Sequence, residues 1–114
     1  MKRLVFALDL VKDRDAIAEY EAWHRADRIW PAVVASLRSS GLTALEIFRT
    51  GNRLCLIMEA PDDFALADKA AADAANPDVQ AWERLMWTFQ RALPWSLPGE
   101  KWVAMERIFS LKDV

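Results

Sequence analysis

The segment that decides the fold is TALEIFRTGNRLCLIMEA, residues 43–60. Residues 43–49 and 53–60 are rich in the apolar and β-branched side chains of strands. Between them, Thr50-Gly51-Asn52 supplies residues that tolerate positive φ, as a tight turn requires. This segment therefore predicts a β-hairpin in the middle of the chain.

Further elements are expected on both sides of the hairpin. Residues 3–11 alternate and have apolar side chains on both faces, which predicts a strand. Capping residues, prolines and glycines typical of helix ends predict helices in most of the remaining chain. The expected helices start at Asp13-Arg14-Asp15, run from Trp30-Pro31 to Gly41, cover about Phe64 to Ala75, and follow Asn76-Pro77; after a loop at residues 93–99, Trp102–Leu111 is expected to be the last strand.

The resulting order β-α-β-β-α-β predicts an α+β, ferredoxin-like fold: a four-stranded antiparallel sheet with helices on one face. The expected strands are apolar on both faces, for example at Leu54 and Cys55 and at Trp102 and Val103. Helices can cover only one of those faces, and a bare apolar sheet face is unusual in a monomer. We therefore expect a homodimer that packs sheet against sheet, a dimeric α+β barrel.

Composition narrows the classes of protein. The 114 residues fit a single domain (residues 1–114), with 54% hydrophobic and 28% charged residues. The net charge of −2 and the lack of a basic patch argue against a nucleic-acid partner. The apolar runs are too short to span a membrane. The lone Cys55 and the absence of a proper signal peptide lead us to expect a cytoplasmic protein.

The strongest candidates for chemistry are the single tyrosine, Tyr20, and the single histidine, His24. A spacing of four residues places both side chains on one face of a helix. His24 can act as a general acid or base near neutral pH, with the Tyr20 phenol orienting a hydroxyl or relaying a proton. The alternative is that both are partly buried helix residues whose polar ends simply form hydrogen bonds.

Aromatic and acidic residues give weaker indications. Flat rings suit the C–H faces of sugars, but most of the six tryptophans, including Trp82 on its helical stripe, also fit a core. Glu106 lies inside an otherwise apolar expected strand, so it must face solvent or be paired. Glu46 and Glu59 are expected on the surface of the hairpin.

Several other chemistries lack their motifs. One histidine and one cysteine thirty-one positions apart match no metal-site spacing, so no metal is expected. The three glycines form no phosphate loop, and no Gly-x-Ser-x-Gly motif is present. Cys55, inside an expected strand, is read as buried rather than nucleophilic.

Taken together, these residues resemble the L-rhamnose mutarotases, a family of small dimeric α+β barrel enzymes. The resemblance is carried by Tyr20-x-x-x-His24, by Ile29-Trp30-Pro31, by Gln80-x-Trp82-x-x-x-Met86 and by Glu106 near Phe109. It implies an isomerase of the aldose 1-epimerase type, which uses neither metal nor organic cofactor. It also implies that His24 is the proton donor and that Tyr20 and Trp82 contact the sugar; Trp30 and Glu106 are further candidates for sugar binding.

The sequence departs from the family pattern at three places. Two extra residues separate His24 from Trp30, Leu45 stands where the pattern has a tyrosine, and Glu83 replaces the second residue of a Trp-Trp pair. Leu45 and Glu83 therefore become candidates for altered sugar recognition, because buried polar pairing discriminates sugars that differ at one hydroxyl. We expect a substrate of the 6-deoxy-L-hexose class, L-fucose or L-rhamnose, whose α and β anomers interconvert by acid–base ring opening and closure.

Two other functions stay open from the sequence. Cofactor-free monooxygenases and haem-degrading proteins also use dimeric ferredoxin-like sheets, and a histidine beside aromatic rings suits them. A non-catalytic sugar-binding module would use the same aromatic residues without accelerating anomer exchange.

Overall fold

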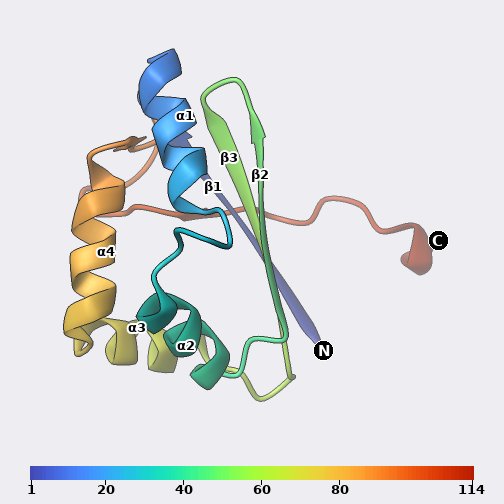
Figure 1. Cartoon of the computed structure of the whole chain (residues 1–114). Coiled ribbons are helices and arrows are strands. Elements are labelled where there is room, and N and C mark those ends of the chain that lie inside the picture. Colours follow the sequence, from blue (N-terminus) through green and yellow to red (C-terminus); the bar gives the residue numbers. More distant parts are fainter.

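The computed structural model describes all 114 residues. The chain forms, in order, nine regular helices and strands and a terminal 3₁₀ turn (Figure 1). These are β1 (Lys2–Leu10), α1 (Arg14–Trp23), α2 (Pro31–Ser39), β2 (Ala44–Thr50), β3 (Arg53–Ala60), α3 (Leu66–Ala74), α4 (Pro77–Trp87), β4 (Gln90–Arg91), β5 (Val103–Ala104) and η1 (Leu111–Asp113).

The sheet is antiparallel throughout, in the order β2-β3-β1, with β4 and β5 both paired to the free edge of β1. The predicted hairpin is β2 and β3, and Gly51 in its turn has a φ of 55°. In the register of the central pair, Phe6 lies opposite Leu56 and Leu8 opposite Leu54. The predicted ferredoxin-like α+β class is confirmed.

The helices begin where the sequence signals place them. The Asp13 side chain accepts a hydrogen bond from the Ala16 amide at 3.1 Å and so caps α1. Pro31 occupies the first turn of α2, and Gly41 beyond its end has a φ of 94°. Asn76 caps α4 through the amides of its first turn. Local chemistry therefore sets most of these boundaries.

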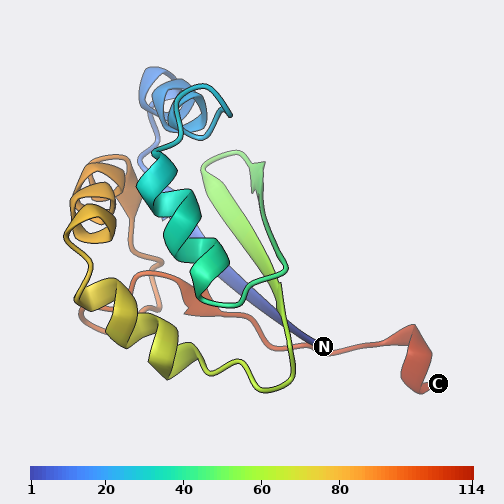
Figure 2. The same ribbon diagram turned by 60° about the horizontal axis from the view of Figure 1, so that its bottom comes forward.

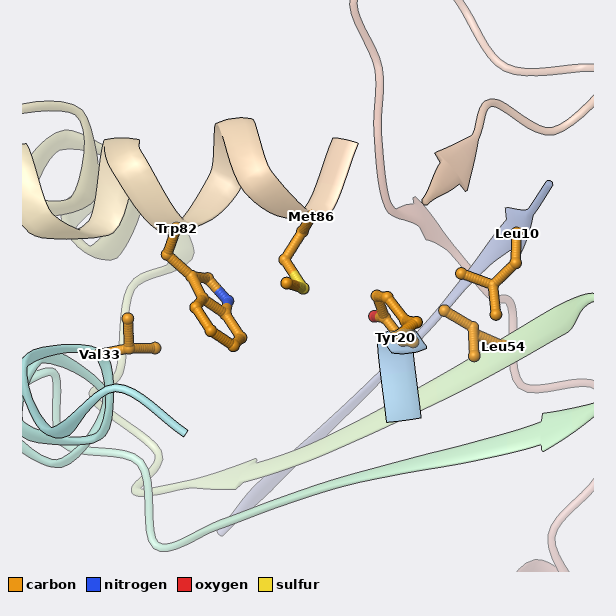
Figure 3. Packing of buried hydrophobic residues seen from close by; sticks show 6 residues of the cluster. All are labelled: Leu10, Tyr20, Val33, Leu54, Trp82 and Met86. Atoms are coloured by element: carbon orange, nitrogen blue, oxygen red, sulfur yellow. The ribbon is translucent and has the colours of Figure 1, made fainter. Parts of the chain in front are cut away.

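All four helices lie on one side of the sheet (Figures 1 and 2). The core fills the space between α1, α2, α4 and that face of the sheet, and its centre consists of six buried residues (Figure 3). These are Leu10, Tyr20, Val33, Leu54, Trp82 and Met86. Trp82 and Met86 project from α4 toward the sheet and Tyr20.

The prediction of a last strand over Trp102–Leu111 is mostly wrong for this single chain. Only Val103–Ala104 pair with β1, followed by one hydrogen bond from the Met105 amide to the Val5 carbonyl at 2.8 Å. Beyond it the chain leaves the sheet and projects away from the body (Figures 1 and 2). Ile108 is 93% exposed, so the alternating apolar pattern of residues 105–111 finds no cover within its own chain.

The second face of the sheet carries no helix (Figure 1). Its side chains include Val5, Cys55 and Ile57, which are half-buried, and Phe48, which is 53% exposed. The expectation of strands that are apolar on both faces therefore holds for β1 and β3. None of the helices combines the length and the apolar character needed to cross a membrane.

Candidate active site

A cavity of about 400 Å³ opens between the helix-covered face of the sheet, the end of α1, α2 and α4. That volume lies within the range of roughly 300–1,000 Å³ found for small-molecule sites. Of its 21 lining residues 14 are hydrophobic, and β1, β2 and β3 contribute a mainly aliphatic wall. A few polar groups are set into this apolar surface, the composition expected of a site that orients a small ligand.

His24 enters the cavity from the end of α1. Its own amide bonds to the Glu21 carbonyl, which tightens the last turn and frees the Tyr20 carbonyl. That carbonyl accepts a hydrogen bond from the His24 ring at Nδ1, 2.7 Å away. Because a carbonyl oxygen can only accept, Nδ1 carries a hydrogen, and in the neutral ring Nε2 keeps its lone pair. Burial lowers the pKa of His24 below its usual 6.5, and the bond to the Tyr20 carbonyl opposes this only in part.

Tyr20 lies beside the imidazole, with the two ring centroids 4.6 Å apart. Its side chain is 3% exposed, and its hydroxyl accepts a hydrogen bond from Nε2 of the buried Gln90 at 3.2 Å. Burial raises the pKa of Tyr20 to about 12, and the bond from Gln90 partly offsets that rise. The phenol therefore stays protonated at neutral pH, and its hydrogen is free to be donated to a ligand.

Two tryptophans form an aromatic corner next to these groups. The Trp82 ring meets His24 edge to face at 5.5 Å between centroids, and Trp30 meets Trp82 in the same way at 5.3 Å. Trp82 lines the cavity, whereas Trp30 supports it from behind and is not part of the lining. Trp23 is covered by the Arg28 guanidinium, 4.1 Å from its ring centroid, and is not among the residues that line the cavity.

Two side chains of opposite charge border the cavity near α4. Glu83 and Lys101 both line it, and the Nζ atom of Lys101 lies 5.1 Å from the centroid of the Trp87 ring. Burial lowers the pKa of Lys101, while the charge of Glu83 opposes the shift. Gln80 donates a hydrogen bond to Glu83 at 3.3 Å. Glu83 and Lys101 thus place charge in the wall of the cavity.

The structure brings most of the predicted site residues together. Tyr20, His24, Leu45, Trp82 and Glu83 all line the one cavity, although they come from three different elements. Trp30 reaches it only through Trp82. Glu106 lies in the exposed C-terminal segment and does not line the cavity in this chain.

Sequence reasoning missed five polar lining residues: Ser36, Lys69, Asp73, Gln90 and Lys101. Gln90 stands just past α4 in the short strand β4, which no periodicity indicated. Lys101 precedes β5 in a stretch that reads as a loop. No pattern in the sequence singles out Gln90, which stands between Phe89 and Arg91. The chain contains no cluster of three His, Cys, Asp or Glu side chains arranged to hold a metal ion.

Comparison with known proteins identifies the family of this chain. The chain matches the L-rhamnose mutarotase family over residues 3–111. It belongs to this family. An L-fucose mutarotase of Xanthomonas campestris pv. campestris is 54% identical over 113 residues, which cover 99% of this chain and 90% of that protein. A UPF0734 protein of Dictyostelium discoideum is 33% identical, covering 92% of this chain and 86% of its own length.

Solved structures agree with the family at the level of the fold. The L-rhamnose mutarotase of Formosa agariphila superposes with a TM-score of 0.70 at 22% identity, covering 97% of this chain and 99% of the other. The tetracenomycin F2 cyclase of Streptomyces glaucescens follows with a TM-score of 0.63 at 16% identity, covering 96% of both chains. The predicted mutarotase family, and with it the isomerase class that interconverts sugar anomers, is confirmed by the family match and the L-fucose mutarotase relative.

Proposed function

We propose that this protein interconverts the α and β anomers of L-fucose and that His24 carries the proton. The observation that supports this most directly is the fixed imidazole: Nδ1 is held by the Tyr20 carbonyl, so Nε2 is the atom that remains to exchange a proton. The choice of L-fucose rests on the 54% identity to a mutarotase of that sugar.

Ring opening needs a proton to leave the C1 hydroxyl and another to reach the ring oxygen, O5. In the proposed step, neutral His24 takes the hydroxyl proton at Nε2. The electrons left on O1 form the aldehyde, the C1–O5 bond breaks, and O5 takes the proton back from the imidazolium. One nitrogen can serve both transfers because O1 and O5 are bonded to the same carbon. Rotation about C1–C2 and the reverse steps close the ring on its other face, so His24 is the proton donor to O1 in closure.

The neighbouring residues are assigned to binding. Tyr20, protonated because burial raises its pKa to about 12, donates a hydrogen bond to a sugar oxygen. Trp82 offers an apolar surface for the C–H groups of the ring, and Trp30 fixes the angle of Trp82 by the edge-to-face contact between them.

Leu45 and Glu83 are proposed to set which sugar is preferred. L-fucose and L-rhamnose differ in configuration at C2 and C4, so selection between them needs groups that recognise single hydroxyls. Leu45 places an apolar side chain in the wall, and Glu83 places a hydrogen-bond acceptor beside Lys101. A charged acceptor distinguishes hydroxyl configurations more strongly than an aromatic ring does.

The active form is proposed to be a homodimer in the cytoplasm. The uncovered sheet face presents Val5, Phe48 and Ile57, and the C-terminal segment that carries Glu106 and Phe109 extends beyond its own body. A second copy packed on that face would bury both. In that assembly Glu106 is available to the partner's surface rather than to its own cavity.

The experiment that tests this function is saturation-transfer NMR on L-fucose, L-rhamnose and D-glucose, with and without the protein. Irradiation of one anomeric proton is expected to reduce the signal of the other anomer of L-fucose at catalytic protein concentrations. An absorbance spectrum of the same sample separates the haem-protein alternative, which requires a Soret band. Binding of L-fucose without faster exchange would instead assign the chain as a sugar-binding module.

A further inference from the structure

Gln90 is a buried polar residue of the cavity wall with unused hydrogen-bonding capacity. Its side chain is 6% exposed and lines the cavity beside Tyr20. The Nε2 atom donates to the Tyr20 hydroxyl at 3.2 Å, but Oε1 is buried and has no hydrogen-bond partner in the protein. Buried side-chain acceptors are nearly always paired, so an orphaned one inside a cavity indicates a partner that arrives with the ligand.

The contact between the two side chains also fixes which groups they present. The Tyr20 oxygen accepts from Gln90, so the Tyr20 hydrogen points to another acceptor. The pair therefore has one donor left to use, the Tyr20 hydroxyl, and one buried acceptor that no protein group pairs, Gln90 Oε1. Two neighbouring oxygens of a pyranose, of which at least one is a hydroxyl, match that arrangement.

We propose that Gln90 is a specificity-determining residue that accepts a hydrogen bond from one hydroxyl of the sugar through Oε1, while its Nε2 positions the Tyr20 hydroxyl. This inference rests on the proposed function and adds to it a binding contact. A site that pairs a buried acceptor with a substrate hydroxyl rejects an analogue without that hydroxyl, because the acceptor is then left unpaired.

The test compares wild type with Gln90→Met on L-fucose and on its 2-deoxy, 3-deoxy and 4-deoxy analogues, by the kcat/KM of anomer exchange. In the wild type, one analogue is expected to lose about 100-fold or more relative to L-fucose. In Gln90→Met, that loss is expected to shrink to within about threefold, while the loss at any hydroxyl that neither Gln90 nor Tyr20 binds stays as it was. Differences in intrinsic reactivity between the sugars cancel when the wild type and Gln90→Met are compared, because both enzymes act on the same analogues.

Two further variants keep the result interpretable. Gln90→Glu retains an oxygen at the end of a side chain of the same length, and it is expected to keep the penalty at the same sugar position; it also serves if Gln90→Met does not fold. Arg91→Met makes the same replacement at the exposed neighbour in β4 and is expected to leave every ratio unchanged. The melting temperature of Gln90→Met is expected to equal or exceed that of the wild type, because the substitution removes an unpaired buried acceptor.

Identical penalties at all three positions in wild type and Gln90→Met, with the wild type active, would overturn the inference and leave the mutarotase function intact. A lower melting temperature together with an unchanged pattern would assign Gln90 to packing alone. If the wild type exchanges none of the sugars, the proposed function fails, and the role of Gln90 fails with it.

Discussion

The Nδ1 atom of His24 lies 2.7 Å from the backbone carbonyl oxygen of Tyr20, one helical turn earlier in α1. Through this contact the end of the helix fixes the orientation of the imidazole and selects the neutral form that keeps a lone pair on Nε2. The last turn of α1 therefore holds His24 in the orientation and tautomer that a general base requires.

The first prediction concerns pH. Burial lowers the pKa of His24 below 6.5, and the reaction is proposed to start from the neutral ring. The enzyme-catalysed kcat/KM, after subtraction of spontaneous exchange, is expected to be flat above pH 6.5. It is expected to fall tenfold per pH unit once the pH drops below the lowered pKa. A rate that increases from pH 7 to pH 5 would show that the imidazolium, not the imidazole, starts the reaction.

A second prediction separates Tyr20 from His24. Tyr20→Phe removes one hydrogen bond to the sugar but leaves the backbone carbonyl that holds His24, so kcat/KM is expected to fall about 10-fold to 100-fold and not to vanish. Tyr20 is expected to cause no inflection in the wild-type rate up to pH 10, since its pKa is about 12. A loss as large as that of a His24 variant would make the phenol a proton-transfer group.

The sugar preference gives a third prediction. The double variant Leu45→Tyr/Glu83→Trp restores the residues of the family pattern at two cavity positions. The ratio of kcat/KM for L-rhamnose to that for L-fucose is expected to rise about tenfold or more, because each altered hydrogen bond changes discrimination by roughly 1–3 kcal/mol. Arg84→Trp, at an exposed position of α4 outside the cavity lining, is the matched control. An unchanged ratio would place the selection elsewhere in the cavity.

A fourth prediction concerns assembly. Light scattering is expected to give twice the chain mass of 13.0 kDa for the wild type. Ile57→Glu, in the middle of the uncovered sheet face, is expected to give a folded monomer. A carboxylate buried in an apolar interface would lose its hydration without gaining a partner. Ala35→Glu, on the exposed side of α2, is expected to stay dimeric. A wild-type monomer would contradict the proposed sheet-to-sheet packing.

The hairpin, the helix starts and the shared face of Tyr20 and His24 could be predicted because short-range chemistry sets them. Gly51 needs a positive φ, Asp13 and Asn76 cap their helices, and a spacing of four residues is enough to align two side chains. The resemblance to the mutarotase family then added Trp82, Leu45 and Glu83 to the predicted site residues, and all three line the cavity.

Other features depend on contacts between distant segments, and the sequence could not supply them. Gln90 becomes a cavity residue only because β4 pairs with the end of β1 and brings it beside Tyr20. Lys101 reaches the cavity from a loop. The alternation of Trp102–Leu111 is typical of a strand, but only Val103–Ala104 pair with β1, and the remainder, including Glu106, extends from the body.

The central claim is that His24 performs the proton transfers, and saturation-transfer NMR on L-fucose with wild type and His24→Asn tests it most directly. Asparagine can still donate to the Tyr20 carbonyl but offers no base, so circular dichroism and melting temperature are expected to stay close to those of the wild type. Enzyme-catalysed exchange is expected to fall by about 100-fold to 10,000-fold. Exchange at the wild-type rate in a folded His24→Asn protein would contradict the account.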